Sequence, residues 1–335
     1  MGTTTAAQAG QYLWIGLPGV KLGVADRRAL KAIQPGGIVL FARNVDASGQ
    51  LRAFTASLKF CVPLRPLLAM DVECGKVNRL RDIIGALPGI AEIKKTRKPG
   101  EARRLGHTIG RALREFGIDL DFAPVLDLNL FGATTDNALD SRCWGRRPAT
   151  VARWAGAFVD GLKAAGVAPC AKHFPGLGGA RRDSHEHLPT INRSAKELWT
   201  EDVRPYRDLL PKLGAIMIGH GHYPAYDGKK LVPASLSQKI VTGLLRKRMG
   251  FDGLVVTDDL DMGAISQCCA FADAVVSAFY AGVDMLMVCH SAEKILTAHE
   301  TLTKAIESGR ISPTRLAQSR RRIERFRQNW VGRTG

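Results

Sequence analysis

The segment 172–185 holds the side chains of this chain that are best suited to acid and base chemistry. Lys172 and His173 end a short apolar run, which predicts a strand that delivers both side chains into a pocket. A proline and three glycines then follow within five residues and indicate an irregular loop. Asp183 and His185 stand two residues apart, so in an extended backbone the carboxylate can orient the imidazole. The alternative interpretation is that the aspartate only begins a turn.

A second candidate for chemistry is Asp258, at the end of the apolar run 253–257. A rigid carboxylate can attack the anomeric carbon of a sugar, while another group protonates the leaving oxygen and then activates water. That second group is usually a carboxyl, and here His185 supported by Asp183 would replace it. The alternative for Asp258 is helix capping, which the adjacent Asp259 can provide instead.

A pocket for a neutral polyol needs donors and acceptors that reach adjacent hydroxyls. Asp71 and the pair Lys172–His173 suit this role, Arg142 adds a rigid fork of donors, and Trp144 offers an apolar face. Structural alternatives remain open for these residues: Asp71 could form an internal ion pair with Arg79, and Arg142 could clamp a loop.

Three histidines, His220, His222 and His290, raise the question of a metal site. They lack the His-x-x-x-His spacing of a helical metal motif, and no carboxylate set stands near them in the sequence. We therefore expect no metal, and expect His220 to order loops by hydrogen bonding.

These residues need a scaffold that gathers them, and the chain predicts one. About eight apolar runs recur, each separated from the next by a helical segment, as in parallel sheets that are buried on both faces. The pattern predicts an α/β TIM barrel formed by a single domain over residues 1–335, with enlarged loops at the carboxyl ends of the strands. An open doubly wound sheet is the alternative, but no Gly-x-Gly-x-x-Gly follows the first strand. The predicted strands are 12–16, 37–41, 66–71, 119–124, 167–172, 215–219, 254–258 and 285–288.

The carboxyl ends of these strands carry most of the candidate side chains, and that is where a TIM barrel places its active site. The longest loops, 72–100, 125–149, 173–194 and 220–236, leave from the same end. Helices are expected between the strands, among them 195–210 and 264–281. On the C-terminal helix, the basic residues 320–322, with Arg325 and Arg327, are expected to form a solvated face.

The composition bears on whether the protein binds nucleic acid, crosses a membrane or is secreted. The chain has 335 residues, is 45% hydrophobic and carries a formal charge of +17, but its basic groups are dispersed and no nucleic-acid motif accompanies them. Residues 1–10 lack the basic start and apolar core that are typical of a signal peptide, and no apolar run reaches membrane-spanning length. Seven scattered cysteines without Cys-x-x-Cys spacing indicate reduced thiols. We therefore expect a cytoplasmic protein, with no nucleic-acid or membrane partner. The sequence leaves the oligomeric state open, with a monomer as the expectation.

Taken together, the motifs resemble the bacterial β-N-acetylglucosaminidases of glycoside hydrolase family 3 that recycle peptidoglycan. The resemblance runs nearly end to end, through 37–44, 71–79, 122–127, 142–145, 172–176, 183–185, 233–237 and 257–260. It implies a TIM barrel, no cofactor, and a retaining mechanism on carbohydrate substrates, the N-acetylglucosaminyl-1,6-anhydro-muramyl fragments. It also implies Asp258 as the nucleophile and His185 as the acid/base, with Asp183 as its partner. The implied sugar-binding residues are Asp71, Arg79, Arg142, Lys172 and His173.

The chain also departs from the pattern of that family. Cys74 stands for a glycine, Lys76 for an arginine and Leu177 for a histidine, and Arg181–Arg182 make the loop unusually basic. Three other functions stay open. A family 3 phosphorylase would release N-acetylglucosamine-1-phosphate, and the basic loop could attract phosphate. A second possibility is a sugar-binding protein that has lost catalytic turnover through the changes at Cys74 and Lys76. A neutral β-glucosidase or β-xylosidase is less favoured, because the histidine arrangement and the lack of a second domain resemble the N-acetylglucosaminidases.

Overall fold

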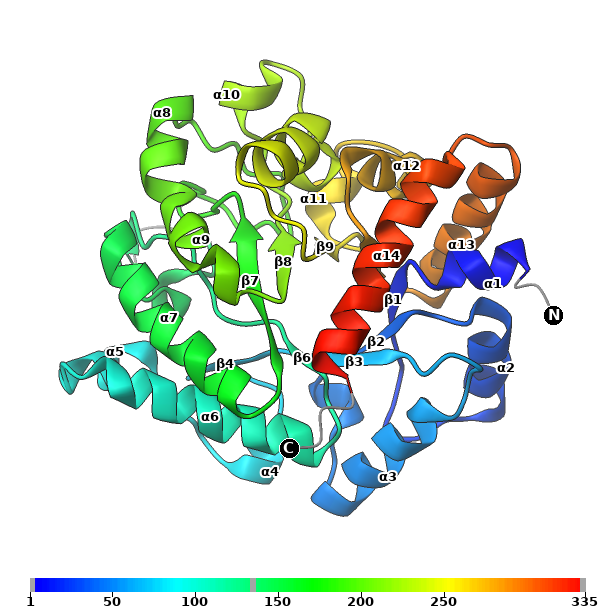
Figure 1. Cartoon of the computed structure of the whole chain (residues 1–335), viewed down its shortest axis with the longest axis horizontal. Coiled ribbons are helices and arrows are strands. Elements are labelled where there is room, and N and C mark those ends of the chain that lie inside the picture. The colour runs from blue at the N-terminus through cyan, green and yellow to red at the C-terminus, as the bar shows by residue number, and fades with distance from the viewer. Residues whose placement is uncertain (1–3, 133–136, 332–335) are drawn as a thin grey trace.

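Eight parallel strands close into a barrel in the structure, a computed structural model that describes residues 4–132 and 137–331 (Figure 1). The order around the barrel is β1-β10-β9-β8-β7-β6-β3-β2, and each neighbouring pair runs parallel. The predicted TIM barrel is therefore confirmed, and the open doubly wound sheet is wrong. The strands are β1 (Leu13–Gly16), β2 (Gly37–Leu40), β3 (Leu67–Met70), β6 (Leu120–Asp121), β7 (Ala168–Phe174), β8 (Ala215–Ile218), β9 (Leu254–Asp259) and β10 (Met285–Val288).

Helices surround the barrel, as Figure 1 shows. The longer ones are α2 (Val24–Ile33), α3 (Ser48–Lys59), α6 (Pro99–Glu115), α7 (Pro148–Ala164), α12 (Phe271–Ala281), α13 (Ala292–Glu307) and α14 (Pro313–Trp330). Shorter ones are α1 (Thr5–Gly10), α4 (Arg81–Ile84), α5 (Ile90–Lys95), α8 (Ala195–Glu197), α9 (Arg204–Leu209), α10 (Pro224–Asp227) and α11 (Gly263–Ser266), with π-helical turns over Leu198–Asp202 and Lys239–Arg248. Within the described ranges, no helix combines the length and apolar character needed to cross a membrane.

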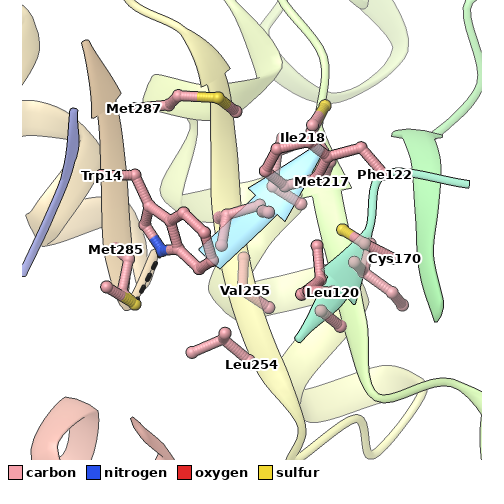
Figure 2. Packing of buried hydrophobic residues seen from close by; sticks show 14 of the residues in the cluster. Trp14, Leu120, Phe122, Cys170, Met217, Ile218, Leu254, Val255, Met285 and Met287 are labelled. Carbon is pink, nitrogen blue, oxygen red and sulfur yellow. Dashed lines mark hydrogen bonds between the residues drawn. The ribbon is translucent and has the colours of Figure 1, made fainter. Parts of the chain in front are cut away.

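Apolar side chains fill the inside of the barrel. Trp14 of β1 is fully buried, and its indole N–H donates a hydrogen bond of 2.8 Å to the sulfur of Met285 (Figure 2). Phe122, Met217 and Met287 pack in the same core (Figure 2) and form the apolar floor of a cavity at the carboxyl ends of the strands. The interior is thus a packed core that supports a site at one end of the barrel.

Two predicted helices are wrong in detail. The segment predicted as 195–210 is interrupted by a π-helical turn at Leu198–Asp202, just before Pro205. Proline has no N–H and cannot continue the α-helical ladder, so the wider turn takes up the mismatch. The segment predicted as 264–281 is two helices, α11 and α12. Between them, Gln267 donates from Nε2 to the Glu186 carbonyl at 2.7 Å, so the break ties this region to the 183–187 loop.

The loops at the carboxyl ends of the strands carry further structure. After β3, the chain forms an antiparallel hairpin of β4 (Val72–Cys74) and β5 (Val77–Asn78). The buried Asp121 carboxylate accepts a hydrogen bond of 2.9 Å from the Val72 N–H and anchors this hairpin to β6. Residues 133–136 of the predicted loop 125–149 lie outside the described residues.

The predicted solvated basic face of the C-terminal helix is wrong in part. Figure 1 shows α14, in red, running across the barrel. Two of its arginines contact segments that precede the strands. Arg327 donates to the carbonyls of Gly36 and Arg65, and Arg322 contacts Asp284 and Asp252. These side chains therefore close the amino-terminal end of the barrel instead of facing water.

Asp284 accepts several of the hydrogen bonds that close this end of the barrel, so its replacement is expected to lower the stability of the protein. The fully buried carboxylate accepts from the guanidinium groups of Arg246 and Arg322, the Ser319 hydroxyl and the Val255 N–H. Asp284→Asn leaves the buried Arg246 cation without a carboxylate partner, while Arg322 keeps Asp252, so we expect it to lower the free energy of unfolding by about 3–5 kcal/mol. Urea unfolding measures this change.

The matched control for that experiment is Arg320→Gln, which removes an exposed pair with Glu324 on the same helix. It should change stability by less than about 0.5 kcal/mol. Equal stabilities for the two variants would show that the cluster around Asp284 contributes no more than an exposed ion pair.

Candidate active site

A cavity of about 820 Å³ opens where the strands finish, a volume that suits a small ligand. It is lined by residues at the ends of β2, β3, β7, β9 and β10 and by the long loops that follow them. The eight charged or histidine side chains that the sequence singled out for catalysis or sugar binding all line this one cavity, whereas Trp144 does not. They are Asp71, Arg79, Arg142, Lys172, His173, Asp183, His185 and Asp258.

Glu73 on β4, which sequence reasoning missed, joins two of the predicted sugar-binding cations. Its carboxylate accepts from Nε and Nη2 of Arg142 at 2.9 and 2.7 Å, a bidentate contact. The ammonium of Lys172 lies 2.8 Å from Glu73 Oε1 and also donates to Asp71. Planar bidentate contacts hold a guanidinium in one orientation, so Arg142 and Lys172 are fixed before any ligand arrives.

Opposite charges keep this cluster ionised despite its burial. Burial on its own would raise the pKa of the Glu73 carboxyl, but the neighbouring Lys172 and Arg142 cations lower it well below its usual range. Burial would likewise depress the pKa of Lys172 and of Arg142, and the carboxylates of Glu73 and Asp71 raise both instead. The cavity therefore presents two permanently charged donors.

Arg79 is held differently from its neighbours. The Asp71–Arg79 ion pair that the sequence allowed is not formed, since Asp71 pairs with Lys172. Within the described ranges, Arg79 makes no salt bridge, and its buried Nε has no hydrogen-bond partner. A buried donor without a partner is costly unless something else satisfies it. Because Arg79 lines the cavity, a bound ligand is the natural acceptor.

His173 is fixed by a second residue that the sequence did not assign, Asp127. The fully buried Asp127 carboxylate lies 2.7 Å from Nδ1 of His173 and accepts from the N–H groups of His173 and Leu177. With Nδ1 committed, Nε2 is the ring nitrogen left for the cavity. The same three contacts hold the start of the glycine-rich loop.

The glycines of that loop allow close packing of the backbone as well as conformational freedom. A Cβ on Gly178 would lie 2.1 Å from the carbonyl oxygen of Leu128, a distance that real Cβ atoms do not reach. Glycine is needed there for close approach of two backbone segments.

Asp258 stands at the rim of the barrel, near the end of β9, and is partly exposed to the cavity. Its Oδ1 accepts a hydrogen bond of 2.9 Å from the Asp259 N–H, and in the described part of the chain no other hydrogen bond engages this carboxylate. Burial raises the pKa of Asp258, but the nearby imidazoles of His173, His220 and His185 lower it overall. The carboxylate is thus ionised, rigid and open on one side.

The Asp183–His185 pair forms, but not in the extended backbone that the sequence suggested. Asp183 Oδ1 lies 2.6 Å from Nδ1 of His185 and also accepts the His185 backbone N–H at 2.9 Å. The backbone turns at 184–186, and the carbonyl of Asp183 accepts from the His187 N–H. The alternative that Asp183 only begins a turn is therefore wrong, although a turn does form, because an aspartate can bond its own chain two residues on while it orients a ring.

The environment of His185 favours a protonated ring. The hydrogen bond with Asp183 raises the pKa of His185, and the charge of Asp258 adds to this, while partial burial opposes it. Burial raises the pKa of Asp183, yet its hydrogen bonds from His185 lower it overall. The ring is 63% exposed, so Nε2 is accessible to a ligand in the cavity.

Two predictions for side chains near the cavity are wrong. Trp144 is almost fully buried and packs against Phe158, with ring centroids 5.8 Å apart, because its loop folds inward onto α7. It therefore offers no face to a sugar. Asp259 does not cap a helix, since α11 begins only at Gly263. Its Oδ2 contacts Nδ1 of His290 at 2.8 Å and its Oδ1 accepts from the Cys289 N–H, which joins the ends of β9 and β10.

The histidines that raised the question of a metal make protein contacts. His220 lies between the Ser235 hydroxyl and the Asp259 carbonyl, so its predicted role in ordering loops is confirmed. The expectation that His290 lacks nearby carboxylates is wrong, because Asp259 and Asp261 lie beside it. Asp261 accepts from the N–H groups of His290 and Ser291, and Lys294 lies 3.3 Å from its other oxygen. Asp261 Oδ1 accepts no hydrogen bond within the described residues, but the nearby Lys294 ammonium places a positive charge beside it, which disfavours a bound cation.

Removing the charge of Glu73 is expected to disorder the two cations that it holds. For Glu73→Gln we expect kcat/KM on the β-N-acetylglucosaminide substrate that the resemblance implies to fall by about 10- to 100-fold, since misplacing binding groups by about 1 Å has costs of that size. Steady-state kinetics measure the change. The comparison variant Glu186→Gln alters an exposed carboxylate next to His185 and should stay within about threefold of wild type. Equal losses in both variants would contradict the proposed role of Glu73.

Cys74, which stands where the family pattern has glycine, lies at φ +152°, a region that disfavours any side chain. We expect Cys74→Gly to be more stable than Cys74→Ala by about 1 kcal/mol in urea unfolding, because both lose the sulfur but only alanine keeps the Cβ. Cys143 provides the matched control, with an ordinary φ of −88°. There alanine should be the more stable variant, by about 0.5–1 kcal/mol. The same order at both positions would contradict strain at Cys74.

Comparison with known proteins agrees with this arrangement. The glycosyl hydrolase family 3 N-terminal domain matches residues 9–326. A β-hexosaminidase of Pseudomonas aeruginosa (strain LESB58) is 36% identical over 296 residues, which cover 87% of this chain and 86% of that protein. Among solved structures, a family 3 β-N-acetylglucosaminidase from Paenibacillus sp. FPU-7 superposes with a TM-score of 0.93 at 34% identity. This chain is covered completely but spans only 64% of that one.

A second structure, a family 3 glycosyl hydrolase of Mycobacterium smegmatis, has a TM-score of 0.84 at 35% identity, and 96% of each chain is covered. The match of the family domain extends over nearly all of the barrel described above, including every residue that lines the cavity. The chain therefore belongs to glycoside hydrolase family 3.

Proposed function

We propose that this protein is a retaining exo-acting β-N-acetylglucosaminidase, which hydrolyses terminal β-linked N-acetylglucosamine through Asp258 and His185. The chain is a glycoside hydrolase by family, and the relatives described as β-hexosaminidase and β-N-acetylglucosaminidase support this choice of sugar. The observation that carries the proposal is the cavity itself. An ionised carboxylate on a strand end and an imidazole held by a carboxylate line the same space as a fixed set of polar groups.

In the first step, a carboxylate oxygen of Asp258 forms a bond to the anomeric carbon as the bond from that carbon to the leaving oxygen breaks. His185 supplies the proton to the leaving oxygen from Nε2, while Asp183 stabilises the charged ring and keeps it oriented. In the second step, neutral His185 takes a proton from water. The water oxygen bonds to the anomeric carbon, the bond to Asp258 breaks, and the sugar leaves with its original configuration.

The remaining residues would bind the sugar. Arg142 and Lys172 present donors that Glu73 fixes in place, and Asp71 presents an acceptor. His173, oriented by Asp127, and the unpartnered Nε of Arg79 complete the set. Several donors that are held before binding lose little entropy when a ring with multiple hydroxyls arrives.

The natural substrate within this class is proposed to be an N-acetylglucosaminyl-1,6-anhydro-muropeptide from peptidoglycan recycling in the cytoplasm. A net charge of +17 favours anionic muropeptides, and all seven cysteines are free thiols, as expected in a reducing compartment. We propose that a single barrel domain, acting as a monomer, carries the activity. The family match over residues 9–326 supports the single domain.

Release of 4-nitrophenol from its β-N-acetylglucosaminide, compared with the β-glucoside, tests the proposed reaction. We expect turnover of the first substrate and little of the second, at the same rate with and without inorganic phosphate. A sugar-1-phosphate product that forms only with phosphate would overturn hydrolysis in favour of phosphorolysis. No turnover of either substrate or of a muropeptide by folded protein would overturn the proposal in favour of a binding protein.

A further inference from the structure

A second cavity, of about 600 Å³, lies on the other side of the loop that carries Asp183 and His185. Arg181 and Arg182 line it at one edge of this loop and Leu188 and Pro189 at the other, whereas residues 183–185 line the catalytic cavity. We propose that this second cavity is a binding subsite for an anionic, partly apolar portion of the leaving group, such as a peptide that bears carboxylates. The inference rests on the proposed function and adds the residues that would select its substrate.

Two arginines line this cavity, and the described residues provide no acidic partner for either one. Both Arg181 and Arg182 are exposed, and in the described ranges no carboxylate lies within salt-bridge distance of either one. The other charged residues that line the cavity, Arg193 and Glu197, have protein partners of their own. Arg193 forms ion pairs with Glu201 and Asp202. The Glu197 carboxylate accepts hydrogen bonds from the backbone N–H and the hydroxyl of Ser194, the N-cap residue of α8. Within the described residues, the cavity thus offers two arginines without a carboxylate partner, while Glu197 contributes one negative charge at its edge.

Arg181 is also held in position. Its guanidinium carbon lies 4.7 Å from the ring centroid of Phe131, a cation–π contact that fixes the plane of the group while its N–H edge stays available. Ordered arginines recognise carboxylates well, because less side-chain entropy is lost when they bind.

The rest of the lining suits a ligand that is not a simple ion. Leu130, Phe131, Leu188 and Pro189 supply apolar surface, and Thr190 and Asn192 supply hydrogen-bonding groups. An apolar wall beside a cationic edge matches an amphiphilic acid, whereas inorganic phosphate would use only the edge.

The position of the cavity relative to His185 points to the leaving group. His185 protonates the oxygen through which the leaving group departs, so that group must lie against this loop. Arg182 is three residues from His185, so their Cα atoms are at most about 10 Å apart. A leaving group longer than one sugar can therefore contact His185 with one end and the arginine pair with the other.

The test compares kcat/KM for a β-N-acetylglucosaminyl disaccharide whose leaving group carries a short peptide with free carboxylates, and for the same compound with amidated carboxylates. The neutral 4-nitrophenyl β-N-acetylglucosaminide serves as the reference. We expect wild type to prefer the free acid by about tenfold or more, the size expected for a hydrogen bond to a charged group. In the double variant Arg181→Gln/Arg182→Gln, this preference should be lost, while kcat/KM on the 4-nitrophenyl substrate stays within about twofold.

Arg320→Gln/Arg321→Gln is the matched control. It removes the same two charges from α14, at the opposite end of the barrel, and should keep the preference of wild type. Loss of preference in both double variants would overturn the subsite in favour of a general attraction by net charge. If the Arg181/Arg182 variant keeps the preference for the free acid, the subsite is overturned outright. It is also overturned if kcat/KM falls equally on the 4-nitrophenyl substrate, because the arginines would then act by holding the loop that carries Asp183 and His185. If wild type does not hydrolyse the 4-nitrophenyl substrate or either disaccharide, the proposed function itself has failed.

Discussion

Asp258→Ala is expected to lower kcat/KM on 4-nitrophenyl β-N-acetylglucosaminide by about 10⁴-fold or more, since losses of that size follow removal of a nucleophile. The side chain accepts one hydrogen bond, from the Asp259 N–H, so folding should be little affected. The loss should therefore appear in kinetics and not in the melting temperature. Stopped assays at high enzyme concentration measure the residual rate.

Azide provides a positive test of the same substitution. With the carboxylate removed, a small anion can occupy its place and attack the anomeric carbon directly, which yields a glycosyl azide of inverted configuration. Asp140→Ala is the control, because Asp140 lines the mouth of the cavity as an exposed carboxylate and has no assigned role in the reaction. A similar loss in both variants, or an Asp258→Ala enzyme that keeps more than about a tenth of its activity, would contradict the nucleophile assignment.

His185→Gln is expected to affect substrates according to their leaving groups. A disaccharide needs protonation of its leaving oxygen, so its kcat/KM should fall by about 10²- to 10⁴-fold, the range for loss of a general acid. 4-Nitrophenolate departs without help, so for that substrate kcat/KM should fall by less than about tenfold. The kcat for the same substrate should fall further, because the second step still needs a base. Equal losses of kcat/KM on both substrates would indicate that His185 positions the sugar instead.

The pH dependence of kcat/KM tests whether Asp183 raises the pKa of His185. On the disaccharide, whose leaving oxygen must be protonated, kcat/KM falls as pH rises through the pKa of the His185 ring, which its hydrogen bond with Asp183 raises above the usual value. Asp183→Asn should lower that pKa and shift the alkaline limb to lower pH. The acid limb reports ionisation of Asp258, whose pKa is lowered, so it should stay in place below the usual range of an aspartate. Profiles that superpose would contradict the pairing.

The barrel and the set of residues around its cavity could be predicted from the sequence, because both follow from local pattern. Apolar runs that alternate with helices specify a parallel barrel, and the barrel places every strand end at the same rim. Asp71, Lys172 and Asp258 stand at such ends, so their meeting follows from topology alone.

Features that depend on partners far away in the chain could not be predicted. Glu73 matters because Arg142 and Lys172 approach it from distant loops and strands, and no spacing in the sequence reports that contact. Arg322 resembles its exposed neighbours in the helix, yet Asp284 draws it inward. Trp144 was expected in the pocket, but packing against Phe158 decided its direction. In each case a tertiary contact overrode a local pattern.

The most direct test of the account is peptide mass spectrometry of His185→Gln after incubation with 4-nitrophenyl β-N-acetylglucosaminide. In this variant the first step proceeds, because the leaving group needs no acid, while the second step lacks its base. A glycosyl-enzyme should accumulate, with the mass of one N-acetylglucosaminyl residue on the peptide that contains Asp258 and none after Asp258→Ala is added. An adduct on another peptide, or 4-nitrophenol released without any adduct and with inverted sugar as product, would contradict retaining catalysis through Asp258.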